Sequence, residues 1–169
     1  MTKHIIKTKR LLLRHFTEND TEFIVQLLNS PGWLAFIGDR NVKTEAQARA
    51  YLLNGPIKSY LENGFGLSLV ETKDDQTPIG MCGLLKRKEL EDPDIGFALL
   101  PEFMGKGYAY EMAQATLAYA QQVLNLSRVT AITVPTNQAS INILQKIGLK
   151  FNKTFSFPND EQELLLFSN

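Results

Sequence analysis

Residues 94–124 read DIGFALLPEFMGKGYAYEMAQATLAYAQQVL, and this stretch decides the fold. Residues 94–100 form a short apolar run, which predicts a buried strand. Beyond a turn at residues 101–107, apolar and small residues recur at spacings of three and four, which predicts an amphipathic helix with one buried face. The stretch is therefore expected to form a strand, a glycine-bearing loop and a helix in succession.

The glycine loop has the composition of an anion site. Gly105 and Gly107 lack Cβ atoms, so main-chain N–H groups can approach a ligand and φ can be positive. The unpaired donors and the positive dipole end of the following helix favour phosphate, with Lys106 and Tyr108 at the rim. An ordinary strand-to-helix turn is the alternative. The dinucleotide fingerprint does not match, because residue 110 is tyrosine where its third glycine would stand, and no nucleoside-triphosphate loop is present.

Length and composition limit the function classes. The 169 residues carry 18 basic and 18 acidic side chains, with no linker and no basic patch, so we expect a single domain spanning residues 1–169 and no nucleic-acid partner. No apolar run approaches membrane-spanning length, and a soluble cytoplasmic protein is the expectation. His4, expected in a fraying terminus, and His15 form no metal-ligand cluster, so no metal is expected. The single cysteine, Cys82, is interpreted as a small buried hydrophobe.

The rest of the chain predicts hairpins first and β-α-β-α units later. Capping boxes are expected at Thr17–Asp20 and Thr44–Gln47, with the second helix broken near Gly55-Pro56. The order predicts an α/β (α+β) fold, with a mixed, mostly antiparallel sheet and helices on both faces. The expected strands are residues 10–16, 65–71, 79–85, 94–100, 128–134, 151–157 and 163–167, and the last helix runs from Asn137 to Gly148.

Several ordered motifs resemble the GNAT-superfamily N-acetyltransferases, and most of all their RimJ/RimL-like, ribosomal-protein-alanine branch. The resemblance covers nearly the whole chain. It rests on KRLLLR at residues 9–14 with Asn19-Asp20, PIG at 78–80 with Gly83-Leu84, IGFAL at 95–99, PEFMGKGYA at 101–109, Asn137-x-x-Ser140, and Lys146-x-Gly148-Leu149.

This resemblance implies that acetyl-CoA is the co-substrate. In the family the pyrophosphate lies on the glycine loop, which here comprises Gly105, Lys106, Gly107, Tyr108, Ala109 and Tyr110. The pantetheine arm runs along the central strand, so Phe97, Ala98 and Leu99 would supply main-chain hydrogen bonds. The N–H of Leu99 is our candidate to stabilise the oxyanion. Asn137 matches the asparagine that binds the CoA arm, and a plain helix N-cap is its alternative role.

The implied reaction is direct attack of an amine on the acetyl thioester, which calls for a base and an acid. Leu144 stands where many relatives carry a tyrosine acid, and Ile132 stands at the position of a glutamate base used in one branch. Ser140 is the remaining candidate acid, with a packing or helix-surface serine as the alternative. Asp94 is the candidate base, with a solvated strand-end aspartate as the alternative. Other carboxylates on the preceding loop are Glu89, Glu91 and Asp92.

Two classes of function stay open. The first is an enzyme that acetylates a primary amine, on a protein N-terminus or a small molecule, as a monomer or homodimer. The second is a non-catalytic acyl-CoA-binding or regulatory module, and a nucleotide-binding protein is a third interpretation. Four aromatic residues are expected either in the core or on the wall of the acceptor cleft: Trp33, Phe36, Tyr60 and Phe65.

Overall fold

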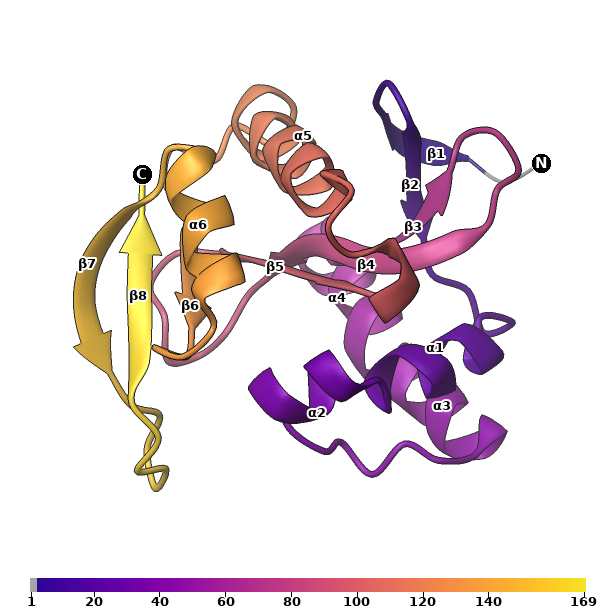
Figure 1. Ribbon diagram of the computed structural model, residues 1–169, viewed down its shortest axis with the longest axis horizontal. Coiled ribbons are helices and arrows are strands. Elements are labelled where there is room, and N and C mark those ends of the chain that lie inside the picture. The colour runs from indigo at the N-terminus through magenta and orange to yellow at the C-terminus, as the bar shows by residue number, and fades with distance from the viewer. Residues whose placement is uncertain (1–2) are drawn as a thin grey trace.

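The computed structural model describes residues 3–169, which form an open eight-stranded sheet in the order β1-β2-β3-β4-β5-β6-β8-β7. Only β5 and β6 pair in parallel, and the other neighbours are antiparallel. Helices α1–α4 cover one face, while α5 lies across the other with α6 beside it (Figure 1). The predicted fold class, a mostly antiparallel mixed sheet with helices on both faces, is confirmed.

The strands are β1 (His4–Lys7), β2 (Leu11–His15), β3 (Leu67–Thr72), β4 (Pro78–Leu85), β5 (Asp94–Leu99), β6 (Thr130–Thr133), β7 (Lys150–Phe155) and β8 (Leu164–Ser168). The helices are α1 (Thr21–Leu28), α2 (Pro31–Phe36), α3 (Glu45–Leu52), α4 (Lys58–Asn63), α5 (Tyr108–Gln122) and α6 (Gln138–Lys146), with a π-helical turn η1 (Leu53–Ile57) and a 3₁₀ turn η2 (Pro101–Phe103). No helix within residues 3–169 is both long enough and apolar enough to cross a bilayer.

The central strand β5 is covered on both faces, as its apolar sequence predicted. Ile95 belongs to the core cluster that contains the α5 residues Ala113 and Leu117, whereas Ala98 packs against the cluster built by α1 and α3. Since side chains alternate along a strand, residues 95, 97 and 99 face α5, and residues 94, 96 and 98 face the α1–α4 side.

The beginning of the chain differs from the sequence-based expectation. His4 does not lie in a fraying terminus, because it opens β1, which pairs with β2. Its Nε2 lies 3.4 Å from Oε2 of Glu71, and Ile5 and Ile6 pack against the cluster beneath α5. The strand was missed because four residues carry too little periodicity, whereas tertiary packing fixes them in place.

One of the two predicted capping boxes forms. Thr44 accepts a hydrogen bond from the Gln47 N–H, and the Gln47 side-chain oxygen accepts one from the Thr44 N–H. The box at Thr17–Asp20 was wrong: α1 begins at Thr21 without a side-chain cap. The Asp20 carboxylate instead accepts from the Thr17 N–H at 2.7 Å and from Arg14 at 2.8 and 3.0 Å.

The helix expected to break near Gly55-Pro56 continues instead. The π-helical turn η1 joins α3 to α4 and contains Pro56. In a π-helical turn the main-chain hydrogen bonds span one residue more than in an α-helix. This wider turn accommodates a proline, which has no N–H to donate. The continuous α3–η1–α4 segment lies on the same side of the sheet as α1 and α2 (Figure 1).

Candidate functional site

The two parallel strands β5 and β6 form a wedge. They share one register pair, Asp94 with Thr130, where the Thr130 N–H donates to the Pro93 carbonyl at 2.9 Å. Toward the carboxyl ends, at Leu99 and Thr133, the ladder holds no further register pair, and β6 runs away from β5 (Figure 1). The wedge is therefore closed at Asp94 and open at the end that leads into the glycine loop.

Main-chain groups of β5 line this wedge. The Leu100 N–H donates to the Ile79 carbonyl of β4 at 2.8 Å. Because the hydrogen-bonding edge alternates along a strand, the main-chain groups of Phe97 and Leu99 face β6 and the wedge. Ala98 is different, since its groups face Met81 on β4. A ligand that pairs with β5 thus meets the N–H and C=O groups of Phe97 and Leu99.

The glycine loop has the expected geometry. Gly105 and Gly107 have φ values of +73° and +81°, in the region that residues with a Cβ rarely adopt. Gly107 is the N-cap of α5, and no side chain caps this helix. The N–H groups of the first turn of α5 are therefore free of a side-chain cap at the open end of the wedge.

The beginning of α6 lies at the same edge of the sheet, because the carboxyl ends of parallel neighbours share an edge. Asn137 Oδ1 accepts from the Ser140 N–H at 3.2 Å, so Asn137 does cap α6. Its Nδ2 group forms no hydrogen bond with another residue in the 3–169 range. The half-buried Ser140 lies one turn before Leu144, which is 1% exposed in the core and offers no acid.

Asp94 lies at the closed end and is not the solvated strand-end residue offered as the alternative. It is 1% exposed, and both carboxylate oxygens accept from Nε of Arg87, at 3.0 and 3.2 Å. Burial raises the pKa of Asp94, and the Arg87 guanidinium pulls it only part of the way back. On the preceding loop Glu89 and Glu91 are exposed, and Asp92 pairs with Arg128 at 3.4 Å.

Asp20 shows why the environment of Asp94 is unusual. It is also a largely buried aspartate with an arginine partner, but Arg14 binds it through two nitrogens and Thr17 adds its N–H and hydroxyl. Burial tends to raise the pKa of Asp20, yet these donors outweigh burial and the pKa is lowered. Asp94 receives one side-chain donor atom, Arg87 Nε, so its charge is stabilised less.

The predicted site residues do not converge on one point. Asp94 and Leu99 are five residues apart on β5, which separates them by about 17 Å at the rise of an extended strand. A single thioester carbon cannot lie within hydrogen-bond reach of both. Phe97 is three residues from Asp94, or about 10 Å, and its N–H faces the wedge as Leu99's does.

A groove of about 360 Å³ opens on the α1–α4 side, beneath the closed end of the wedge. Tyr51, η1, α4 and residues 84–87 line it, so Arg87 connects Asp94 to the groove. Phe157, in the loop between β7 and β8, has its ring 5.8 Å from the Arg87 guanidinium. Burial raises the pKa of the Tyr51 hydroxyl against the opposing influence of Arg40 and Arg87.

Sequence reasoning missed Arg87 and Tyr51. Arg87 stands in the charged run KRKELEDPD, residues 86–94, where nothing singles it out from its neighbours. Tyr51 carries the helical spacing of a core residue. Arg87 meets Asp94 through the hairpin of β4 and β5, whereas Tyr51 shares the groove with Arg87 only through the long-range packing of α3.

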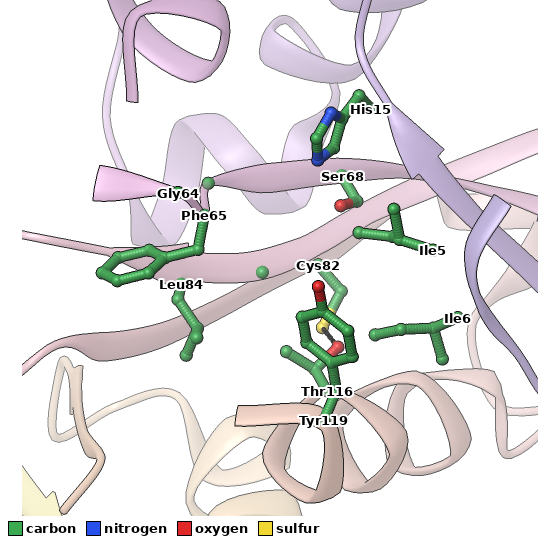
Figure 2. A pocket seen from close by; sticks show the side chains of 12 residues that line it. Ile5, Ile6, His15, Gly64, Phe65, Ser68, Cys82, Leu84, Thr116 and Tyr119 are labelled. Carbon is green, nitrogen blue, oxygen red and sulfur yellow. Dashed lines mark hydrogen bonds between the residues drawn. The ribbon is translucent and has the colours of Figure 1, made fainter. Parts of the chain in front are cut away.

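Cys82 takes the predicted structural role. Figure 2 shows it with Thr116 and Tyr119 in a small pocket between the sheet and α5, with a volume of about 20 Å³, room for about one water molecule. The thiol lies 3.3 Å from Oγ1 of Thr116 and 3.6 Å from the Met112 carbonyl. Burial raises its pKa to about 12, which disfavours the thiolate.

The four aromatic residues divide between core and surface. Trp33 is 7% exposed, and its indole N–H is the one buried side-chain donor that lacks a partner within residues 3–169. Tyr60 accepts from the Phe16 N–H and donates to the Leu67 carbonyl. Phe65 packs against the cluster under α5, whereas Phe36 is 39% exposed. Within the same range, no cluster of His, Cys, Asp and Glu could hold a metal ion.

Comparisons with known proteins agree on a family. The protein-family model described as "Acetyltransferase (GNAT) domain" matches residues 10–150 of this chain. The uncharacterized N-acetyltransferase YnaD of Bacillus subtilis is 30% identical over 145 residues, covering 86% of this chain and 82% of its own. A crystal structure of a GNAT-family acetyltransferase from Bacillus anthracis has a TM-score of 0.80 and 26% identity, over 97% of this chain and 96% of that one.

One solved structure with the same fold contains a bound ligand, coenzyme A. RimL, a ribosomal L7/L12 alpha-N-protein acetyltransferase whose structure is in complex with coenzyme A, has a TM-score of 0.84 at 16% identity, over 99% of this chain and 97% of that one. The wedge and the glycine loop described above thus occur in a chain whose family model and relatives are acetyltransferases. The chain belongs to the GNAT acetyltransferase family.

Proposed function

We propose that this acetyltransferase moves an acetyl group from acetyl-CoA to a primary amine, a protein N-terminus or a small molecule, by direct attack in a ternary complex in the cytoplasm. The observation that carries the proposal is the wedge: an unpaired edge of β5 that leads directly into a loop with two glycines at positive φ. An extended donor can pair with the strand while its diphosphate lies at the loop.

The residues at the open end fit such a donor. The Gly105–Tyr110 segment would bind the diphosphate through the N–H groups of the α5 terminus, and Phe97 and Leu99 would pair with the arm. Asn137, although it caps α6, retains its amide N–H donors for the arm. Ala98 would contribute shape rather than main-chain hydrogen bonds, because its own groups face β4.

At the closed end, the thioester would lie nearer Phe97 than Leu99, because the donor enters from the loop and runs toward Asp94. An N–H of β5, that of Phe97 or of our initial candidate Leu99, would stabilise the negative charge that develops on the carbonyl oxygen. Asp94 would accept the amine proton through water. Its raised pKa and single arginine donor suit a base better than a fully satisfied carboxylate would.

The leaving thiolate also needs a proton. Ser140 is the hydroxyl that α6 offers near the wedge, since Leu144 is buried in the core. Leucine at position 144, where many relatives carry a tyrosine acid, is also the observation that favours the second candidate. That candidate is a non-catalytic acyl-CoA-binding module that keeps the donor site and has lost the acid.

A thiol-release assay with acetyl-CoA tests the proposal against this alternative. The purified chain is assayed with a panel of amines and N-terminal peptides, and CoA binding is measured in parallel by calorimetry. Acetyl transfer to any acceptor of the panel supports the enzyme. CoA binding without turnover on any acceptor supports the module, and the absence of CoA binding contradicts both.

A further inference from the structure

The turn between β1 and β2 is tied to the beginning of α5 through one carboxylate. Glu111 Oε1 accepts from the Thr8 hydroxyl at 2.6 Å and from the Arg10 N–H at 2.8 Å. Its Oε2 accepts from Arg10 Nε at 2.7 Å. Three hydrogen bonds therefore join residues about a hundred positions apart in the chain. All three have the charged carboxylate as acceptor, and the one from the Arg10 guanidinium joins two charged groups.

The same arginine lies against the glycine loop. Arg10 Nη1 donates to the Lys106 carbonyl at 2.9 Å, and its guanidinium carbon lies 4.4 Å from the centre of the Tyr108 ring. A Cβ atom built on Gly107 would lie 3.2 Å from Arg10 Nη2, closer than ordinary van der Waals contact. Arg10 thus contacts the residues on both sides of Gly107.

This contact sets the direction of a main-chain donor. In a trans peptide the C=O and the following N–H point to opposite sides. Because Arg10 holds the Lys106 carbonyl, the Gly107 N–H is turned away from Arg10. Without that hydrogen bond, the Gly107 N–H would also point in other directions, because glycine restricts φ and ψ least and the loop contains two glycines at positive φ. The arginine therefore fixes a conformation that glycine alone only permits.

Arg10 also balances a negative charge at the beginning of α5. Glu111 lies in the first turn of α5, where a carboxylate would compete with an incoming diphosphate for the positive end of the helix. Arg10 and Thr8 occupy both of its oxygens. Burial tends to raise the pKa of Glu111, but the hydrogen bonds from Thr8 and Arg10 outweigh it and keep the pKa low. The pair is locally neutral while it anchors the loop.

We propose that Arg10 and Glu111 are positioning residues that hold the glycine loop ready for the donor's diphosphate. The inference rests on the proposed function, because it assigns a role within the same donor site. It makes a specific claim: the two residues act on the diphosphate part of the donor and not on the arm or the thioester.

The test measures CoA dissociation constants by calorimetry for wild type, Arg10→Ala, Arg10→Lys and Glu111→Gln. Arg10→Ala should weaken CoA binding by about tenfold or more, the effect of losing a charge-assisted hydrogen bond. Arg10→Lys should not restore affinity, because an ammonium cannot bind Glu111 and the Lys106 carbonyl with the fork of a guanidinium. Arg49→Ala is the matched control, since Arg49 forms an exposed pair with Glu45 on α3.

A comparison of donors separates positioning from a general structural role. With acetyl-CoA, kcat/KM of Arg10→Ala should fall by about tenfold, mainly through KM, whereas with acetyl-pantetheine, which lacks the diphosphate, it should fall by about threefold or less. Equal losses on both donors, or a CoA dissociation constant within about twofold of wild type, overturn the inference. If Arg10→Ala does not fold, the same thresholds apply to Glu111→Gln and Thr8→Val. A wild-type chain that binds no CoA overturns the proposed function itself.

Discussion

The two ends of the wedge are built differently. The open end consists mainly of main-chain groups from one continuous stretch, residues 97–110, with two glycines that set their direction, and Asn137 at the start of α6 adds one side chain. The closed end consists of side chains from several segments: Asp94 on β5 and Arg87, seven residues earlier after β4, together with the distant Tyr51 on α3 and Phe157 between β7 and β8. A site made of backbone is encoded locally, whereas a site made of side chains depends on how the whole sheet and its helices assemble.

Removing the carboxylate at the closed end should have the largest effect. Asp94→Asn should lower kcat about a hundredfold, the lower bound expected for loss of a general base, while the CoA dissociation constant stays within about threefold. Activity is measured by thiol release on an acceptor identified in the panel. Asp20→Asn is the control, because it also takes the charge from a largely buried aspartate–arginine pair, outside the site. A kcat for Asp94→Asn equal to that of Asp20→Asn would remove Asp94 from the mechanism.

Disrupting the open end should act on binding instead. Gly107→Val forces a β-branched residue to φ near +81° and towards Arg10, so CoA binding should weaken by about ten- to a hundredfold. Calorimetry measures the change. Gly64→Val imposes the same backbone strain at φ +76°, at the end of α4. If both variants bind CoA as wild type does, the diphosphate does not lie on this loop.

The sequence predicts the open end well because its signals are local. A strand, two glycines and an amphipathic helix in succession predict both the fold of that unit and the ligand class proposed for it. The expected positive φ at Gly105 and Gly107 is present, and so is the Asn137 cap. The short strand β1 was missed, and the cap at Thr17–Asp20 was misplaced. For β1 the deciding contacts are with Glu71 on β3 and with the cluster beneath α5. For Asp20 the deciding partner is Arg14, which lies only six residues earlier but is held on β2.

The closed end could be predicted only in part. Asp94 was proposed because it begins a recognisable strand, yet its burial and its bond to Arg87 follow from the pairing of β4 with β5. The main-chain groups of Phe97 and Leu99 face the wedge, whereas those of Ala98 face β4. This assignment can be made only when the register of the β4–β5 pairing is known. Candidate residues on one strand were assigned to one reaction, although the length of the strand separates Asp94 from Leu99.

The two buried aspartates should respond to pH in opposite ways. The pKa of Asp94 is raised above its ordinary value of 3.8, so the folded state binds its proton more tightly and the contribution of Asp94 to the free energy of unfolding falls as pH rises from about 4 through the raised pKa. The pKa of Asp20 is lowered, so its contribution is present above about 4 and is lost as pH falls. Urea unfolding of wild type, Asp94→Asn and Asp20→Asn between about pH 3 and 7 isolates each contribution. Difference curves of the same sign would contradict the assigned environments.

The smallest effect is expected at Cys82, and it decides whether transfer is direct. A covalent route would carry the acetyl group on a thiolate before the amine attacks, and Cys82 is the single cysteine of the chain. Its thiol is fully buried among Thr116 and Met112, and its pKa is raised to about 12, so the thiolate is scarce at neutral pH. Cys82→Ala should therefore change kcat/KM by less than about twofold, within the range of a conservative packing change. A thiol reagent should label the wild-type chain in urea and spare it when folded. Loss of turnover in a folded Cys82→Ala, or ping-pong kinetics that this substitution abolishes, would replace attack in a ternary complex with an acetyl-enzyme.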